Sequence, residues 1–123
     1  MMSEGKVIDL KIRTKSFALR IIRLYSALPK TTEAQVIGKQ ILRSGTSVGA
    51  QYAEARRARS TAEFVSKIES GLQELEETVY WIELLIDAKI VTVGKMQNLQ
   101  QEAEELMSIL VASVKTAKSR KQK

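Results

Sequence analysis

The sequence predicts an all-α protein, an antiparallel up-down-up-down four-helix bundle that associates into an oligomer. Good helix formers dominate the 123-residue chain, and it contains one proline. Apolar residues recur at alternating steps of three and four in four segments, the period of one helix face. Connections of about three residues force successive helices to run antiparallel. We expect a single domain over 1–123, with helices at about 7–28, 32–58, 61–89 and 93–118 and a disordered tail at 119–123.

The first helix, 7–28, is predicted from one apolar stripe, and Pro29 ends it because proline cannot continue a helix. Thr32 and Gln35 form the pattern of a capping box and open the second helix. The stripe of the first helix consists of Leu10, Phe17, Ile21, Leu24 and Leu28, and that of the second of Val36, Ile37, Ile41, Val48, Tyr52 and Ala55.

The second helix also carries a smooth stripe of small residues at four-residue spacing, Gly45, Gly49 and Ala53. A glycine inside a helix costs about 1 kcal/mol relative to alanine. A chain tolerates this cost where a neighbouring backbone must approach closely. The residues alone leave open whether that neighbour lies within the subunit or in another one, and we take Gly45 and Gly49 as candidates for a subunit interface.

The third helix begins at Thr61, because Ser60 and Glu63 have the spacing of a capping box, and Thr92 can cap the fourth. The junction before Thr61 is so short that the second and third helices could also run nearly end to end across a corner. The third stripe is Phe64, Ile68, Leu72, Leu75, Val79, Ile82 and Ile86, and the fourth is Met96, Leu99, Ala103, Leu106, Leu110 and Ala117.

Composition excludes several classes of function. The chain has no cysteine and no histidine, which removes disulfides, thiolate or imidazole metal ligands and the commonest general base. No signal peptide is evident at the N-terminus, and no apolar run approaches the ~20 residues that span a bilayer. We therefore expect a cytoplasmic protein without cofactor, metal or membrane contact.

Charge is unevenly distributed along the chain. Residues 1–60 hold twelve basic and four acidic residues, 61–114 hold three and ten, and 115–123 hold five basic residues and no acidic one. Clustered arginines supply the sequence-independent part of nucleic-acid binding, because the guanidinium matches phosphate geometry. The alternatives are a solvated face or pairing with the acidic third helix at Glu74, Glu76 and Glu77. The candidate phosphate contacts are Arg13, Arg20, Arg23, Arg56, Arg57 and Arg59.

Further residues indicate a subunit interface. A polar ladder on one helix face is expected to cross between subunits, with Arg43 pairing a carboxylate; its members are Arg43, Ser47, Gln51 and Glu54. Tyr80 and Trp81 are adjacent, so they point about 100° apart on a helix and cannot both join the core stripe. We take Trp81 as the aromatic that is buried by a second subunit, against the alternative of a partly exposed residue on its own subunit.

One enzymatic hypothesis remains. Glu74 and Glu77 are three residues apart and could share a magnesium ion, with Asp87 further along the helix. Acidic runs on helices are usually solvated, and no histidine is present for a di-iron site. A carboxylate–magnesium hydrolase is therefore only a remote alternative, and no catalytic residue is assigned.

The segment Arg43 to Ala55, the basic residues after it, Glu63-Phe64 and the segment Leu72 to Thr78 resemble a known family. The chain is similar over roughly 17–118 to the bacterial four-helix-bundle proteins, also called S23 or 23S ribosomal RNA intervening-sequence proteins. Arg43, Ser47, Ala53 and Glu54 match its motif. The chain departs from that motif at Gly49, Gln51 and Ala55, where proline, asparagine and glycine are common.

The resemblance implies ring-like homopentamers, encoded in many cases within 23S ribosomal RNA genes. It also implies kinship with a retroelement accessory protein whose basic surface serves RNA and a reverse transcriptase. Most members have no established biochemical activity. We therefore expect a non-enzymatic, pentameric module that binds RNA or a nucleoprotein; the alternative is a structural scaffold for a protein partner.

Overall fold

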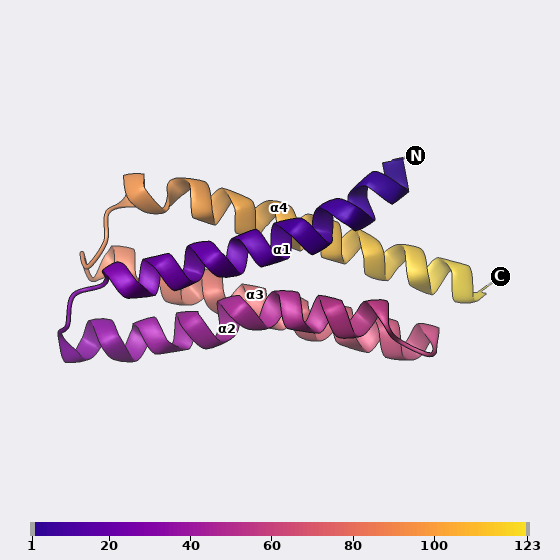
Figure 1. The fold of residues 1–123 in the computed structure, drawn as a ribbon, viewed down its shortest axis with the longest axis horizontal. Coiled ribbons are helices and arrows are strands. Elements are labelled where there is room, and N and C mark those ends of the chain that lie inside the picture. Colours follow the sequence, from indigo (N-terminus) through magenta and orange to yellow (C-terminus); the bar gives the residue numbers. More distant parts are fainter. Residues whose placement is uncertain (1, 123) are drawn as a thin grey trace.

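The protein forms four antiparallel helices, as the sequence predicts. The computed structural model describes the backbone of residues 2–122 and the side chains of residues 10–120. The helices are α1 (Met2–Ala27), α2 (Thr32–Arg56), α3 (Thr61–Asp87) and α4 (Val93–Gln122). The chain reverses at each connection, so that both of its ends lie at the same end of the bundle (Figure 1). The α2–α3 interface is the most extensive and the α1–α4 interface the least, so the end-to-end arrangement of α2 and α3 is excluded.

The fourth helix is longer than the sequence analysis predicts. α4 continues to Gln122, whereas the apolar pattern predicts a helix to about residue 118 and a disordered tail from residue 119. Neither glycine nor proline follows Ala117, so nothing in the sequence stops the helix. At the other termini, α2 ends at Arg56 and α3 at Asp87, each two residues before the expected position.

The caps agree with the sequence at two helices and differ at one. The Ser60 hydroxyl accepts the amide of Glu63 at 3.0 Å, and that of Thr92 accepts the amide of Lys95 at 3.3 Å. At α2 the cap is Thr31, one residue before the expected Thr32, because the Thr31 hydroxyl accepts the amide of Ala34.

The expected capping partner, Gln35, turns back toward α1 instead. Its side-chain oxygen accepts the hydroxyl of Tyr25 at 3.0 Å, and its side-chain nitrogen donates to the carbonyl of Pro29 at 2.8 Å. Gln35 therefore fastens the α1–α2 turn rather than the first turn of α2.

A left-handed residue ends α3. Lys89 has a φ of 62°, a conformation that costs an ordinary side chain free energy and that glycine adopts readily. The following amide of Ile90 donates to the carbonyl of Leu85 at 2.9 Å, which satisfies a carbonyl at the helix end. This turn redirects the chain into α4.

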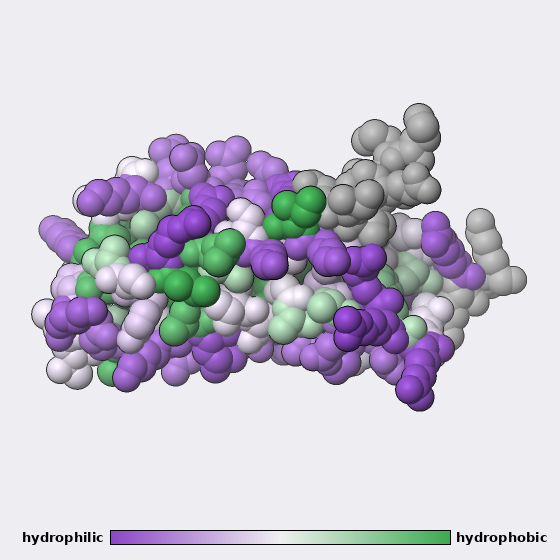
Figure 2. All heavy atoms as spheres, in the orientation of Figure 1, coloured by the Kyte–Doolittle hydropathy of each residue, from purple (hydrophilic) through white to green (hydrophobic). Residues whose placement is uncertain are grey.

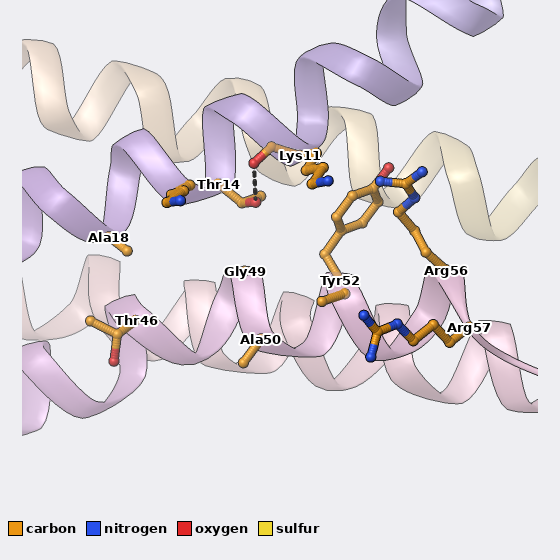
Figure 3. A pocket seen from close by; sticks show the side chains of 11 residues that line it. Lys11, Thr14, Ala18, Thr46, Gly49, Ala50, Tyr52, Arg56 and Arg57 are labelled. Carbon is orange, nitrogen blue, oxygen red and sulfur yellow. Dashed lines mark hydrogen bonds between the residues drawn. The ribbon is translucent and has the colours of Figure 1, made fainter.

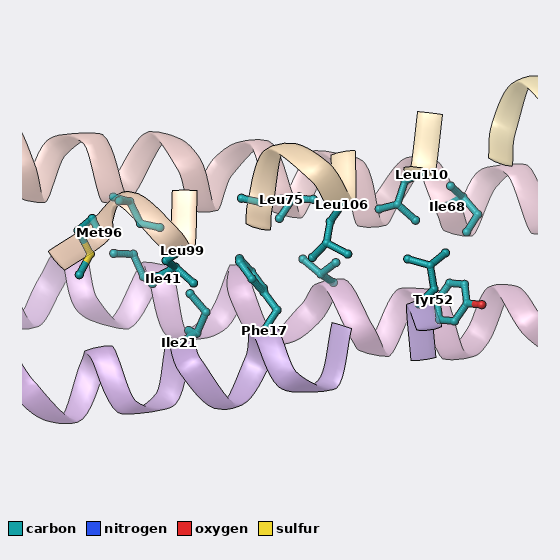
Figure 4. Packing of buried hydrophobic residues seen from close by; sticks show 14 of the residues in the cluster. Phe17, Ile21, Ile41, Tyr52, Ile68, Leu75, Met96, Leu99, Leu106 and Leu110 are labelled. Atoms are coloured by element: carbon teal, nitrogen blue, oxygen red, sulfur yellow. The ribbon is translucent and has the colours of Figure 1, made fainter. Parts of the chain in front are cut away.

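The core runs along the bundle axis and receives side chains from all four helices (Figure 4). Most of its largest buried members lie on the stripes that the sequence predicts, among them Phe17, Ile21, Ile41, Leu75 and Leu106. Two positions differ: Leu85, off the predicted stripe, is fully buried, and Val36, on it, is 58% exposed. One polar contact crosses it, where the hydroxyls of Ser44 and Thr78 lie 2.7 Å apart between α2 and α3. Thr78 also donates to the carbonyl of Glu74, so both hydroxyls are satisfied.

The small-residue stripe packs α2 against α1 within the subunit. A Cβ on Gly45 would lie 2.7 Å from Ile21 Cγ1, and one on Gly49 would lie 3.3 Å from Thr14 Oγ1. The structure therefore corrects the assignment of Gly45 and Gly49 to a subunit interface. The glycines admit the bulky face of α1, and this close approach is the reason that helix α2 tolerates them.

Candidate nucleic-acid interface

The uneven charge along the sequence becomes two layers in the fold. The α1–α2 hairpin holds most of the basic residues, and α3 with the first half of α4 holds most of the acidic ones. Ion pairs join the two layers where they meet. Each predicted cation therefore either pairs with the acidic layer or remains available on the basic one.

Arg13 belongs to the first group. Its Nε donates to Glu102 at 3.0 Å, and its Nη2 donates to Glu102 at 2.7 Å and to Glu105 at 2.9 Å. Such a forked pair is among the stronger charge-assisted contacts, and it holds α1 to α4. The structure thus corrects the expectation that Arg13 contacts phosphate, because carboxylates already occupy its guanidinium.

The expected polar ladder exists, but it lies within one subunit. Arg43 on α2 donates to Glu74 at 3.1 Å and to Glu77 at 2.7 Å on α3. Partial burial lowers the pKa of Arg43, but hydrogen bonds to the two carboxylates and their negative charges outweigh it and raise that pKa. The alternative of pairing with the acidic third helix therefore applies to Arg43 itself.

The other ladder residues also make contacts inside the subunit. Ser47 donates to the carbonyl of Arg43 at 2.7 Å, Gln51 packs beside Gly71 on α3, and Glu54 pairs with Lys67 at 2.6 Å. The hydrogen bond and charge of Glu54 raise the pKa of Lys67. All four therefore join α2 to α3 or lie within α2, and their placement at a subunit interface stays a prediction.

The two adjacent aromatics on α3 differ in how far they are buried. Trp81 is half-buried and packs against the core of its own subunit, and its assignment to a subunit interface stays a prediction. Its neighbour Tyr80 points outward with 54% of its surface exposed, and the two rings meet edge to face at 5.2 Å. Tyr80 is thus the more exposed aromatic of the two on α3.

The carboxylates of the remote magnesium hypothesis have other partners. Glu74 and Glu77 share the Arg43 guanidinium. Within the described part of the chain, no group of three or more potential ligands is placed to hold a metal ion.

A basic groove lies between α1 and the C-terminal half of α2 (Figure 3). It encloses about 510 Å³. Lys11 and Lys15 line it from α1, and Arg56 and Arg57 line it from α2. None of the described lining residues is acidic. Apart from Tyr52, the other lining side chains are small; the remaining residues are Thr14, Ala18, Thr46, Gly49, Ala50, Tyr52 and Ala53.

The four cations of the basic groove have no carboxylate partner among the described side chains. Among the described residues, none of Lys11, Lys15, Arg56 and Arg57 forms an ion pair with a carboxylate. Tyr52 and Arg56 project from α2 toward Lys11 (Figure 3). Burial raises the pKa of Tyr52, and the positive charge of Arg56 opposes that rise. The groove therefore presents concentrated positive charge that an anion can neutralise.

The structure separates the remaining predicted contacts. Arg20 and Arg23 line a different groove, beside the start of α4, and Arg59 lines a hollow together with Arg120 at the α2–α3 turn. Of the six predicted arginines, the basic groove gathers Arg56 and Arg57. Lys11 and Lys15 are not among the predicted contacts. Their spacing with Ala18 places all three on one flank of a helix, a signal that points to a shared surface.

The fold and this groove define a class of protein: an antiparallel four-helix bundle with a basic surface groove. Residues 8–112 match the 23S rRNA-intervening sequence protein family, and the chain belongs to that family. None of the described helices is long and apolar enough to cross a membrane.

A solved structure agrees with this assignment. It is the crystal structure of a protein of unknown function from the S23 ribosomal protein family of Bacteroides thetaiotaomicron. The two chains are 39% identical with a TM-score of 0.82, over 86% of this chain and 98% of that one. No curated protein is significantly similar to the chain.

Proposed function

We propose that the protein is a non-enzymatic, homo-oligomeric module that binds structured RNA, free or within a nucleoprotein, through the basic groove. The observation that carries the proposal is a set of four cations that line one groove and, among the described side chains, have no carboxylate beside them. Arginine forks and lysine ammonium groups suit phosphate oxygens, and the small lining residues let a backbone approach closely. The protein would bind such an RNA in the cytoplasm.

The groove favours the phosphate backbone over the bases. Binding of single strands usually relies on aromatic side chains on which bases stack. The aromatic in the groove, Tyr52, is 6% exposed and therefore offers almost no stacking surface. We expect recognition of helical RNA by shape and charge, with little preference for sequence.

Self-association is the second part of the proposal. The outer face of α1 carries the exposed apolar residues Ile12, Leu19 and Ile22 beside basic ones, and the outer face of α3 carries Tyr80 among glutamates. These two faces are complementary in charge, so a head-to-tail contact can repeat around a ring. The number five is taken from the family resemblance. A ring would repeat the basic groove and raise avidity for a long RNA without any new contact.

The test is fluorescence anisotropy with a labelled RNA hairpin, from about 50 to 200 mM salt. The variant Arg56→Gln/Arg57→Gln is compared with Lys30→Gln/Lys39→Gln, which loses the same charge at exposed positions outside the groove. Native mass spectrometry first establishes the assembly mass of each protein. An assembly mass of one chain would contradict the oligomeric part of the proposal without affecting the groove.

We expect the wild type to bind with an affinity that falls log-linearly with salt. The groove variant should bind about tenfold more weakly or worse, and its salt slope should fall by about two, since each arginine neutralises about one phosphate. The control should stay close to the wild type. Equal decreases in both variants, or no binding at low salt, would overturn the proposal.

A further inference from the structure

A second groove lies at the opposite end of the bundle from the basic groove. It encloses about 390 Å³ between the C-terminal end of α1 and the segment that leads into α4. We call it the apolar groove. Leu24, Leu28, Met96 and Leu99 line it with apolar side chains. Its size falls within the range of ligand sites in proteins, about 300–1,000 Å³.

Three cations surround this apolar lining. They are Arg20 and Arg23 on α1 and Lys95 on α4, and none of the described lining residues is acidic. Within the described side chains, none of the three pairs with a carboxylate, although Arg13 on the same helix pairs with two. The apolar groove therefore combines two properties, an apolar lining and unbalanced positive charge.

The apolar surface extends beyond the groove. Val93, next to the lining residue Thr92 at the start of α4, is 60% exposed. In Figure 2, hydrophobic atoms gather over the end of the bundle where α1 ends and α4 begins, with hydrophilic ones between them. An extended partner, with apolar side chains at intervals, would cover this surface better than a small molecule would.

The two grooves lie on different flanks of α1. Arg20 is nine residues after Lys11, which places it about half a turn around the helix at 3.6 residues per turn. A ligand in one groove therefore need not displace a ligand in the other. The apolar groove also differs in chemistry, because apolar side chains separate its cations and its described lining residues include no aromatic on which a base could stack.

We propose that the apolar groove is a docking site for an acidic amphipathic helix of a partner protein. Leucine-like side chains on one face of that helix enter between α1 and α4, and its glutamates or aspartates accept hydrogen bonds from Arg20 and Arg23. Lys95 neutralises a carboxylate on the other side. The module then holds RNA and a protein at once, through separate surfaces.

The probe is a fluorescein-labelled helical peptide of about 15 residues with leucines at i, i+4 and i+7 and glutamates on both flanks. A scrambled peptide of the same composition spreads the leucines around the helix. Binding is measured by anisotropy to the full-length assembly. The variant Arg20→Gln/Arg23→Gln is compared with Arg56→Gln/Arg57→Gln, which removes the same charge from the basic groove.

We expect the amphipathic peptide to bind the wild type and the Arg56/Arg57 variant alike, and to bind the Arg20/Arg23 variant about tenfold more weakly. Binding of the scramble with equal affinity, or equal decreases in both variants, would overturn the proposal, because either result means unspecific charge attraction. Failure of the peptide to bind while decanoate binds at the same arginines would also overturn it, in favour of an amphiphile site. RNA binding measured on the Arg20/Arg23 variant tests the proposed function separately, because this variant leaves the basic groove unchanged.

Methyl NMR locates the peptide. Met96 lines the apolar groove, whereas Met107 lies further along α4 and does not. With labelled methionine methyl groups, titration of the peptide should shift the Met96 signal and leave that of Met107 in place. A shift of Met107 alone would contradict docking at this groove.

Discussion

Individual glycines determine how closely α1 and α2 pack. Gly45 lies directly under Ile21, and the space that a Cβ would need is already filled by three carbons of that side chain. Gly94, in the first turn of α4, has nothing within 4 Å of the corresponding position. Packing against Ile21 requires a glycine at position 45, whereas no neighbour requires one at position 94. Substitution by alanine should therefore affect stability differently at the two positions.

We expect Gly45→Ala to destabilise the protein by up to about 2 kcal/mol. The overpacking penalty of about 1–3 kcal/mol equals or exceeds the gain in helix propensity of about 1 kcal/mol. Gly94→Ala, the matched control, should be neutral or stabilising by up to about 1 kcal/mol. Urea unfolding measures both free energies.

A double variant tests the physical cause. Ile21→Ala removes the atoms that the new Cβ would meet, so Gly45→Ala should cost at least about 1 kcal/mol less in that background. Strict additivity of the two substitutions would show that the clash with Ile21 is not the cause.

At the scale of elements, charged pairs align α2 with α3. Arg43 holds two glutamates on α3, and Lys67 of α3 pairs with Glu54 of α2 further along the same interface. The ion pairs lie on the solvent-facing side of the α2–α3 interface. The hydroxyls of Ser44 and Thr78 meet in its buried interior. The ladder therefore helps to fix the position of α2 along α3 within the subunit.

Arg43→Ala should reduce the stability of the subunit by about 0.5–1 kcal/mol, the range for exposed ion pairs, and this effect should shrink at high salt. The mass of the assembly should not change, because the arginine binds carboxylates of its own chain. Thermal unfolding and native mass spectrometry give the two readouts. A smaller assembly mass would show that Arg43 also joins subunits, as the sequence pattern suggests.

The left-handed residue at the end of α3 offers a stabilising change. Lys89→Gly should raise stability by a few tenths to about 1 kcal/mol, because glycine adopts a positive φ without the Cβ clash and this gain exceeds its larger entropy loss on folding. The comparison is Ala88→Gly, at a right-handed position next to it, which should destabilise. Equal effects of the two changes would mean that backbone strain at Lys89 is negligible.

At the scale of the whole molecule, the two charged layers divide the cations between folding and binding. Arg13 and Arg43 meet the acidic layer and contribute to the fold. The cations of the basic groove lie between α1 and α2, away from that layer. Arg20 and Arg23 face the start of α4, where no carboxylate is among the described lining residues, so they also remain available. One property of the sequence, the excess of positive charge in residues 1–60, thus supplies both structural and binding contacts.

The stability of the whole molecule should be nearly independent of pH between about 6 and 9, since no histidine or cysteine is present to titrate there. Folding raises the pKa of Tyr52 above its ordinary value of 10.0 and that of Lys67 above 10.5. The unfolded chain then releases these protons first, so their contribution is complete below about pH 10 and is lost as pH rises through the folded values. Thermal melts from pH 6 to 12 check this, and a steady slope between pH 6 and 9 at constant assembly mass would contradict it.

Much of the element structure follows from local sequence. The apolar stripes give the helices and their buried faces, and Ser60, Thr92 and Pro29 mark three of the boundaries. The cap of α2 is harder to place, because Thr31 and Thr32 have the same side chain and backbone conformation alone distinguishes them. The end of α4 is equally hard to place, because nothing in its composition stops a helix.

The sequence by itself determined the fold class, the family and the presence of a close helix contact at Gly45 and Gly49, since periodicity and residue size are local properties of the chain. Tertiary structure decided which partner each side chain meets. The glycines pack against α1, and the Arg43 ladder contacts α3. Trp81 packs against the core of its own subunit, and Arg13 pairs with carboxylates on α4. Tertiary structure also brought Lys11 and Lys15 together with Arg56 and Arg57. The physical reason is that helix period fixes the direction of a side chain around its own helix, whereas the rotation and packing of neighbouring helices decide what lies opposite.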